Sequence, residues 1–389
     1  MIEIYEPRED TFLILKEIKR YAKGRVLDMG TGSGVLAIEA ARKAKNVIGA
    51  DINKKALDYA RKKSTGIKNI KFVHSDLFKN IKGKFDLIIF NPPYLPEEKG
   101  EDKWTRLQVS GGKKGHEVLE RFFEKANDYL TRDGKILVLF SSLTNKEKVH
   151  EILGDYSFNY QKLAEESFDF EKLFVYLAEK SELLKGLEEK GISDVKKIAK
   201  GHRGVIYKAE WKRKKIVIKK QRPESEAVGR IQNEAKWLKI LNKKKIGPRF
   251  RFLAEDYFVY DYVEGEFLPS FLEKEGKNSI KKVLAEIMRQ CFVLDKMNIN
   301  KEEMHRPLKH VLIDDKLNVV MLDFERMHYT DKPKNLTQFL QYLKRNFIIK
   351  LLRGKGLKYN RMQLLKFAKH YKKNISEKNF KEIVKSISS

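Results

Sequence analysis

The chain has 389 residues, which is more than one hydrophobic core usually supports, so two domains are expected. Hydrophobic residues make up 41% and charged residues 35% of the sequence, and no apolar run reaches the ~20 residues that cross a bilayer, which excludes a membrane span. The net charge of +28 is uneven, with +5 in residues 1–180 and +23 in the remainder, and the second value favours contact with RNA or the ribosome. A Lys- and Glu-rich surface of the kind found in thermophilic proteins is the alternative explanation.

The amino terminus and the cysteine content indicate the compartment. Residues 1–10 lack both the basic start and the apolar run of a secretory signal. Cys291 is the single cysteine of the sequence and cannot form an internal disulfide. We therefore expect a cytoplasmic protein.

Short apolar runs alternate with amphipathic stretches from Gly24 to about Tyr176. Strands are predicted at RVLDMG, NVIGADI, IKFVHSD, FDLIIFN, GKILVLFSS and LFVYLAE. Between them, VLAIEAARKA, NKKALDYARKKS and GHEVLERFFEKANDYL carry apolar residues at helical spacing. Helical connections between successive strands predict an α/β domain over residues 1–180, with a doubly wound, mostly parallel sheet.

A glycine-rich turn follows the first predicted strand. It contains Asp28, Gly30, Gly32 and Gly34, and glycine at such a turn lets the backbone approach a ligand. Asp51 ends the second strand, where its carboxylate can accept hydrogen bonds from both ribose hydroxyls. Asp76 ends the third strand, in position for an adenine amino group. Because no Lys-Ser/Thr phosphate cradle accompanies them, these residues favour S-adenosylmethionine over ATP, and NAD is an alternative on the pocket pattern alone.

The loop Asn91-Pro92-Pro93-Tyr94 follows the strand FDLIIF, at the sheet edge where doubly wound folds place their chemistry. Proline carbonyls accept hydrogen bonds, but proline nitrogens do not donate them. The Asn91 side-chain oxygen and the Pro92 carbonyl could hold the two N–H groups of a planar amide or amine, with the Tyr94 ring stacked on its face. The loop therefore predicts transfer of a methyl group to a planar nitrogen, with orientation supplying most of the rate gain.

Residues 1–180 resemble the HemK-type glutamine methyltransferases, and particularly their archaeal and eukaryotic branch, which modifies class I translation termination factors. Three stretches carry the resemblance: Tyr5 to Phe12 (YEPREDTF), Asn91 to Tyr94, and Gly111 to Glu117 (GGKKGHE). The resemblance implies a Rossmann-like class I methyltransferase fold and methylation of the glutamine amide in the Gly-Gly-Gln loop of a release factor. It also implies that Thr11, Gly30, Asp51 and Asp76 line the donor pocket, and that a small zinc-containing activator protein assists the enzyme.

Two other acceptors remain open for this domain. Methyltransferases that act on a nucleobase amine in DNA or RNA share the Asn/Asp-Pro-Pro-aromatic loop, although no separate target-recognition domain is visible in this sequence. Lysine methylation is also ascribed to relatives.

The pattern changes after residue 180. LLKGLEEKGISDVKKIAK reads as polar and helical, and GHRGVIYKAEWKRKKIVIKKQR alternates like an antiparallel hairpin. Beyond Glu234 the chain is predicted to be helical, apart from a strand pair at YFVYDYVEG and HVLIDDKLNVVMLDFE. We assign a linker to residues 181–195, an α+β domain to 196–330 and a basic helical extension to 331–389.

The order of features in residues 198–326 resembles a small protein-kinase-like fold, nearest to the atypical archaeal kinases of the Rio and Bud-type group. Gly201 and Gly204 would form a shortened glycine loop over phosphates, Lys219 would pair with the α/β-phosphates, and Glu234 would orient Lys219. Tyr260 to Gly265 reads as the hinge over adenine. Asp323 stands where such kinases bind magnesium, so the resemblance implies ATP and Mg²⁺ as ligands.

The stretch MHRPLKHVLI at residues 304–313 takes the place of the kinase catalytic loop, and it departs from the kinase pattern because it contains no aspartate. Aligned without gaps onto the following strand, His305 takes the position of the base and His310 that of the second metal ligand; aligned on His-Arg-Asp, Pro307 replaces the base. A histidine can deprotonate a hydroxyl near neutral pH. The open readings are an active kinase, a domain that binds nucleotide without transfer, and a reshaped binding module.

The basic stretch KRNFIIKLLRGKGLKYNRMQLLKFAKHYKKN interleaves Lys and Arg with apolar residues at helical spacing. Helices that pack on the preceding domain by their apolar faces explain this pattern, and contact with RNA or the ribosome is the alternative.

Overall fold

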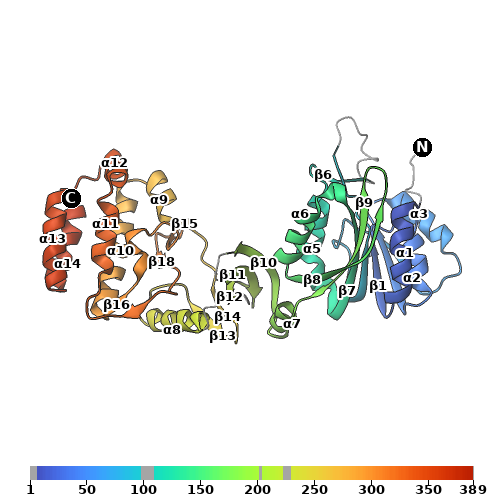
Figure 1. The fold of residues 1–389 in the computed structure, drawn as a ribbon, viewed down its shortest axis with the longest axis horizontal. Helices are drawn as coiled ribbons and strands as arrows, with labels where there is room; N and C mark the ends of the chain where they lie inside the picture. Colours follow the sequence, from blue (N-terminus) through green and yellow to red (C-terminus); the bar gives the residue numbers. More distant parts are fainter. Residues whose placement is uncertain (1–6, 98–108, 201–203, 222–228, 389) are drawn as a thin grey trace. The chain divides into compact units, whose positions relative to one another are not determined.

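The computed structural model describes residues 7–97, 109–200, 204–221 and 229–388 (Figure 1). The chain divides into two compact units. Unit 1 comprises Met1–Ala199 and Tyr207–Arg213, and unit 2 comprises Lys200–Ile206 and Lys214–Ser389. Among the described residues, no helix is both long and apolar enough to cross a membrane.

Unit 1 is built on a seven-stranded sheet of order β3-β2-β1-β4-β7-β9-β8. Its strands are β1 (Arg25–Met29), β2 (Asn46–Asp51), β3 (Ile70–His74), β4 (Phe85–Phe90), β7 (Leu130–Ser141), β8 (Phe158–Ser167) and β9 (Lys172–Lys180). The first five of these in sheet order pair in parallel, whereas β9 is antiparallel to both β7 and β8. The structure thus confirms the doubly wound, mostly parallel sheet of the class I methyltransferase fold.

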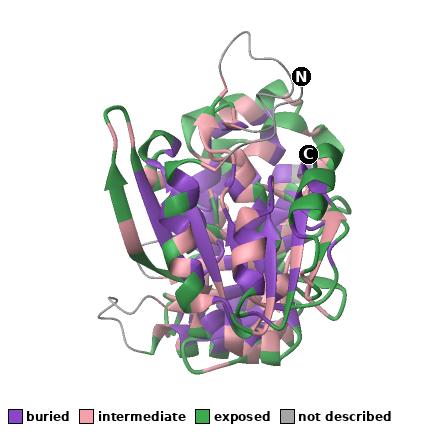
Figure 2. Cartoon of the chain, turned by 90° about the vertical axis from the view of Figure 1, so that its right-hand side faces the viewer, coloured by how far each residue is buried: buried purple, intermediate pink, exposed green. Residues whose placement is uncertain are grey.

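Helices cover both faces of this sheet. They are α1 (Glu9–Tyr21), α2 (Val35–Ala41), α3 (Lys54–Lys63), α5 (Glu117–Tyr129), α6 (Lys146–Asp155) and α7 (Glu182–Glu189). Figure 1 shows α1 and α2 on one face and α5 and α6 on the other. Apolar side chains of α1 and α2 share a core with alternate residues of the central strands, and these strands are buried (Figure 2). The near-continuous apolar runs of the sequence follow from this burial on two sides.

Several elements of unit 1 were not predicted, among them the strand β8 and the helices α1 and α6. Strand β8 was missed because most of its side chains are exposed or only half-buried, so it contains no apolar run. Helix α1 begins at Glu9, within the stretch Tyr5 to Phe12, and buries Leu13, Ile14 and Ile18.

A helix was predicted over residues 183–200. The structure confirms it only as far as Glu189, where α7 ends. Gly191 takes the left-handed conformation at φ +71° and ends the helical stretch, and β10 (Ile192–Lys200) follows as a strand. Pairing with the next strand outweighs its polar composition, since β propensity depends strongly on context. The region assigned as a linker therefore holds a helix and the start of a strand.

A second sheet has the order β10-β11-β12-β14-β13. Its other strands are β11 (Gly204–Trp211), β12 (Lys214–Gln221), β13 (Phe250–Leu253) and β14 (Tyr257–Asp261). Strands β11 and β12 are neighbours joined by Lys212 and Arg213, both at positive φ, as a two-residue hairpin turn requires. The predicted hairpin is confirmed.

Beyond β12, unit 2 is mainly helical. Its helices are α8 (Arg230–Asn242), α9 (Leu268–Lys274), α10 (Lys277–Lys296), α11 (Asn335–Leu343), α12 (Asn346–Gly354), α13 (Arg361–Lys373) and α14 (Glu377–Ser388). The predicted strand pair does not form: β14 joins the second sheet, whereas β17 (Val311–Ile313) and β18 (Val319–Met321) form a hairpin that pairs with β15 (Glu266–Phe267). The carboxyl-terminal helices contribute Leu364, Tyr371, Ile383 and Ile387 to the core of unit 2, as the packing explanation of the basic stretch predicts.

A ring cluster in unit 1 supports a prediction about stability. Phe122 is fully buried, with its ring centroid 4.3 Å from that of Phe90 and 5.2 Å from that of Phe78. Phe122→Ala should lower the free energy of unfolding by about 3–5 kcal/mol, because it removes a buried ring and leaves a cavity. Phe170→Ala is the matched control, since Phe170 is 92% exposed, and it should change stability by less than about 0.5 kcal/mol. Equal shifts of the urea transition for the two variants would contradict the packing described.

Candidate functional site

A cavity of about 680 Å³ lies at the carboxyl ends of β1, β2 and β4 in unit 1. Most of the predicted site residues line it: Thr11, Gly30, Gly32, Asp51, Asp76, Asn91, Pro92, Pro93 and Tyr94. Two others do not. Asp28 is fully buried beneath the glycine turn, and Gly34 packs against α3, where an added Cβ would stand 2.9 Å from the Cβ of Ala60. Asp28 and Gly34 therefore support the turn from behind instead of contacting a ligand.

The glycine turn presents bare backbone to the cavity. Gly30 and Gly32 adopt φ values of +68° and +49°, which other residues rarely adopt. An added Cβ at Gly32 would meet nothing within 4 Å, so the space beside it is open for a ligand. This cradle fits the amino-acid end of S-adenosylmethionine.

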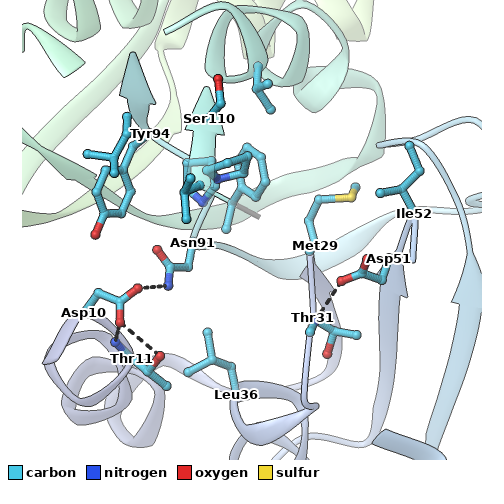
Figure 3. Close-up of a pocket in the computed structure, with 18 of the residues that line it drawn as sticks. Asp10, Thr11, Met29, Thr31, Leu36, Asp51, Ile52, Asn91, Tyr94 and Ser110 are labelled. Carbon is cyan, nitrogen blue, oxygen red and sulfur yellow. Dashed lines mark hydrogen bonds between the residues drawn. The ribbon is translucent and has the colours of Figure 1, made fainter. Parts of the chain in front are cut away.

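Asp51 is held in place by two backbone N–H groups. Its Oδ2 accepts from the Gly32 nitrogen at 2.8 Å, and its Oδ1 accepts from the Asn53 nitrogen at 2.7 Å (Figure 3). Burial raises the pKa of Asp51, and these backbone donors oppose the rise. A carboxylate offers about four acceptor positions, so Asp51 keeps lone pairs for two vicinal ribose hydroxyls.

Asp76 has a partner that the sequence did not reveal. Both of its carboxylate oxygens lie 3.0 Å from Nη2 of Arg121, which also lines the cavity from α5. This pair sets the outer rim of the cavity, on the side assigned to adenine. The sequence could not predict this pair, because Asp76 and Arg121 are 45 positions apart and lie on separate elements.

Asn91 is oriented by Asp10. The Asn91 Nδ2 donates to Oδ2 of Asp10 at 2.7 Å, and the Asp10 Oδ1 accepts from the backbone nitrogen of Thr11 at 2.6 Å (Figure 3). With its nitrogen turned to Asp10, Asn91 leaves Oδ1 buried and without a hydrogen-bond partner. A buried acceptor of this kind is unfavourable unless a ligand donor reaches it. Asp10 was missed because no helix was predicted at this position and its partner Asn91 lies 81 positions away in the sequence.

The glycine-rich stretch from Gly111 to Glu117 packs directly on the loop Asn91–Tyr94. Strand β5 (Leu95–Pro96) pairs in parallel with β6 (Ser110–Gly112). A Cβ on Gly111 would stand 2.8 Å from the Pro93 carbonyl oxygen, and one on Gly115 would stand 2.7 Å from the Tyr94 carbonyl oxygen. Only glycine permits this approach of backbone to backbone, which explains how a distant motif accompanies the loop.

The backbone of Tyr94 is held by a hydrogen bond, and its phenol is uncharged. Its carbonyl accepts a hydrogen bond from the Thr144 hydroxyl at 3.1 Å. Burial, followed by the charge of Asp10, raises the pKa of Tyr94 well above its usual range. The neutral ring offers a π-face and does not act as a base.

Unit 2 contains a cluster of charged side chains that includes several predicted residues. Lys219 Nζ on β12 lies 2.6 Å from Oε2 of Glu234 on α8 and 3.4 Å from Oδ1 of Asp323. Burial opposes the charge of Lys219, but Glu234 and Asp323 outweigh it and raise the pKa of Lys219. Asp323 has a backbone φ of +62°, a conformation that is uncommon for residues other than glycine and is often found at functional sites.

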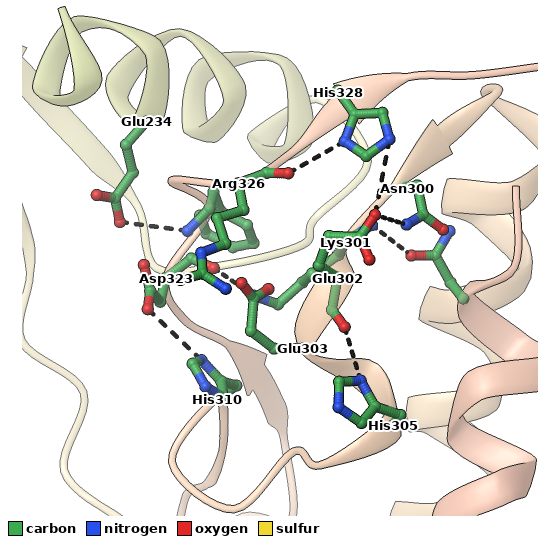
Figure 4. A network of polar contacts seen from close by, with 12 residues as sticks. Glu234, Asn300, Lys301, Glu302, Glu303, His305, His310, Asp323, Arg326 and His328 are labelled. Atoms are coloured by element: carbon green, nitrogen blue, oxygen red, sulfur yellow. Dashed lines mark hydrogen bonds and ion pairs between the residues drawn. The ribbon is translucent and has the colours of Figure 1, made fainter. Parts of the chain in front are cut away.

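His310 and His305 take different positions relative to this cluster (Figure 4). His310 Nδ1 lies 3.6 Å from Oδ2 of Asp323, and burial lowers the pKa of its imidazole. His305 is exposed, and its Nδ1 lies 2.9 Å from the Glu302 carbonyl oxygen. Thus the structure joins His310 to Asp323, whereas His305 faces away from both.

The predicted glycine loop is only partly described. Gly201 lies outside the described residues, and Gly204 opens β11, where an added Cβ would stand 2.9 Å from the Lys220 carbonyl oxygen. In the described part of the chain, no group of three or more His, Cys, Asp or Glu side chains converges as a metal site. Because Mg²⁺ takes oxygen ligands, the Asp323 carboxylate fits it and the His310 imidazole does not, so phosphate and water oxygens would have to supply the other ligands.

The fold of unit 1 and its cavity together define an S-adenosylmethionine-dependent methyltransferase. Residues 9–168 match the family described as methyltransferase small domain. The chain is 40% identical over 177 residues to a protein of Methanocaldococcus jannaschii named "Putative protein N5-glutamine methyltransferase", a match that covers 44% of this chain and 90% of that protein. The chain thus belongs to the HemK-type family of protein N5-glutamine methyltransferases.

Two further similarities involve the same part of the chain. The release factor glutamine methyltransferase of Borreliella burgdorferi is 36% identical over 146 residues, covering 34% of this chain and 51% of that protein. The solved E. cuniculi Mtq2-Trm112 complex, described as acting in methylation of the eRF1 translation termination factor, shows 27% identity and a TM-score of 0.38, covering 46% of this chain and 99% of that chain.

The buried carboxyl of Asp28 predicts a pH dependence of stability. Burial raises the pKa of Asp28 to about 7, and the hydrogen bond from Thr31 Oγ1 at 2.6 Å opposes the rise. The folded state therefore holds this proton more tightly than the unfolded state, and the stabilisation is present below the unfolded pKa of 3.8 and lost as the pH rises through about 7. Asp28→Asn should gain stability relative to the parent between pH 5 and pH 8, measured by urea unfolding. A difference that stays constant across this range would contradict the raised pKa.

Proposed function

We propose that unit 1 methylates the side-chain amide of the glutamine in the Gly-Gly-Gln loop of a translation release factor. The observation that carries this proposal is the Asn91 Oδ1, a buried acceptor without a hydrogen-bond partner on a residue that lines the cavity. A glutamine amide supplies two N–H donors in one plane, and Asn91 Oδ1 together with the Pro92 carbonyl could accept both.

The residues of the chain bind and orient the reactants. S-adenosylmethionine, when bound, supplies an electrophilic methyl group. Asp51 and the glycine turn would hold its ribose and amino-acid parts, and the neutral Tyr94 ring would cover the face of the acceptor amide. Asn91 would keep the acceptor nitrogen in a single orientation, which accounts for catalysis by positioning without a general base. The amide nitrogen would form a bond to the methyl carbon as the bond from that carbon to the donor sulfur breaks with its electron pair left on sulfur, and the amide would lose one proton to solvent.

Family resemblance and the names of relatives support the release factor as substrate. The Borreliella burgdorferi relative is named a release factor glutamine methyltransferase. A nucleobase amine has a similar planar donor pair and is the alternative, whereas a lysine ammonium lacks a planar face for Tyr94. A small zinc-containing activator protein, contact with RNA or the ribosome, and a cytoplasmic location remain predictions from the sequence.

Mass spectrometry tests the substrate directly. A release factor incubated with the chain and S-adenosylmethionine should gain +14 Da on the glutamine of its Gly-Gly-Gln peptide. Asn91→Ala should lower the rate by about 100-fold or more, since it removes an acceptor placed for the reacting amide. The binding of S-adenosylmethionine should stay within a few-fold of the parent, because Asn91 is assigned to the acceptor. A mass gain on lysine, or on RNA in place of the peptide, would overturn the proposed substrate.

We also propose that unit 2 binds ATP with Mg²⁺. The supporting observation is the ion pair of Lys219 with Glu234, next to Asp323 in its left-handed conformation. Lys219 is suited to the α/β-phosphates and the Asp323 carboxylate to Mg²⁺, while His310 stands at the position predicted for a second ligand. The Tyr260–Gly265 stretch would contact adenine. A module that binds RNA and no nucleotide is the alternative.

A thermal-shift experiment tests nucleotide binding. Mg-ATP at about 100 times its dissociation constant should raise the melting temperature by about 5 °C or more, because ligand binding stabilises by about 2.7 kcal/mol under that condition. Lys219→Ala should abolish the shift. Lys214→Ala is the matched control, since Lys214 lies exposed on the same strand, and it should keep the shift. The absence of a shift in the parent protein would refute the nucleotide site.

A further inference from the structure

The polar cluster of unit 2 contains a carboxylate that alignment to a kinase loop does not reveal. The short 3₁₀-helix η2 (Glu302–His305) precedes β17 and carries both Glu303 and His305. His305, the base predicted by ungapped alignment, contacts the Glu302 carbonyl and is exposed. In Figure 4, Glu303 extends toward Asp323, whereas His305 lies on the far side of the helix.

Glu303 is tied to Asp323 through one buried ammonium group. Oε2 of Glu303 accepts from Lys301 Nζ at 3.1 Å, and the same Nζ donates to the backbone carbonyl of Asp323. Lys301 is fully buried, and its Nζ also lies 5.3 Å from the centroid of the Phe324 ring. Because Lys301 is held on three sides, the Glu303 carboxylate has a fixed position beside the proposed phosphate and metal site.

The remaining charged groups of the cluster have other roles. Glu234 is engaged by Lys219 and by the backbone nitrogen of Phe324 at 3.3 Å. Asp323 is occupied by Lys219 and faces His310. The side chain of Glu303 is 14% exposed, and within the described residues Lys301 is its ion-pair partner, through Oε2. Oε1 thus provides an acceptor at the edge of the cluster, where a hydroxyl could enter.

We propose that Glu303 is the general base of phosphoryl transfer in unit 2, a role that rests on the proposed Mg-ATP site. The oxygen of an incoming hydroxyl forms a bond to the γ-phosphorus. The bond from that phosphorus to the β-γ bridging oxygen breaks, and its electron pair leaves with the nucleoside diphosphate. The hydroxyl proton passes to Oε1 of Glu303 and then to solvent. Lys301 keeps the carboxylate of Glu303 in place for this transfer.

The acceptors available without a known substrate are water and the chain's own serine and threonine hydroxyls. The full-length chain is incubated with Mg-[γ-³²P]ATP, and labelled inorganic phosphate and labelled protein are both counted. Binding of Mg-ATP is measured separately by calorimetry for each variant. The variants are Glu303→Gln, Glu303→Asp and His305→Gln.

Glu303→Gln should lower total transfer by about 100-fold or more, as loss of a general base does, while the dissociation constant of Mg-ATP stays within about threefold. Glu303→Asp should recover part of the rate, and His305→Gln should transfer within threefold of the parent. Loss of transfer in His305→Gln but not in Glu303→Gln would overturn the assignment. So would a parent protein that binds Mg-ATP without any transfer, whereas a parent that does not bind Mg-ATP would refute the nucleotide site itself.

Discussion

The hydrogen bond from Asn91 to Asp10 is the interaction on which the methyltransferase site depends. A carboxamide can turn either end toward a ligand, and an Asn91 with its nitrogen facing the cavity would repel the N–H groups of an acceptor amide. Asp10 accepts from Asn91 Nδ2 at 2.7 Å and thereby leaves Oδ1 as the amide atom without a partner. The first turn of α1, far from the loop in sequence, therefore orients the amide that we propose binds the acceptor.

The backbone of the loop is fixed from the opposite side by contacts that allow no side chain. Gly111 and Gly115 bring β6 and the turn after it against the carbonyls of Pro93 and Tyr94. The described parts of the three stretches that carry the family resemblance thus meet at one place in the fold. The spacing of these stretches in the sequence does not explain why they meet. Together they hold the Asn91 side-chain amide and the backbone of the Asn91–Tyr94 loop in place, which does explain it.

The sequence predicted the elements that are buried on both sides and missed those that depend on distant partners. Apolar runs located the central strands, and the glycine turn and Asp51 located the donor side of the cavity. Strand β8 was missed because its side chains are largely exposed, and Arg121 because its partner Asp76 comes from another element. In unit 2, Lys219, Glu234 and Asp323 follow a recognisable order, whereas Glu303 is connected to them only through the fold.

A double-mutant cycle on Asp10 and Asn91 tests the central claim most directly. The rate of methylation of a Gly-Gly-Gln release factor is measured for Asp10→Ala, for Asn91→Ala and for the double variant, with S-adenosylmethionine saturating. If Asp10 acts by orienting Asn91, the double variant should be no slower than Asn91→Ala alone, because no amide remains to be oriented. Two effects that multiply in the double variant would contradict this coupling and assign Asp10 an independent role.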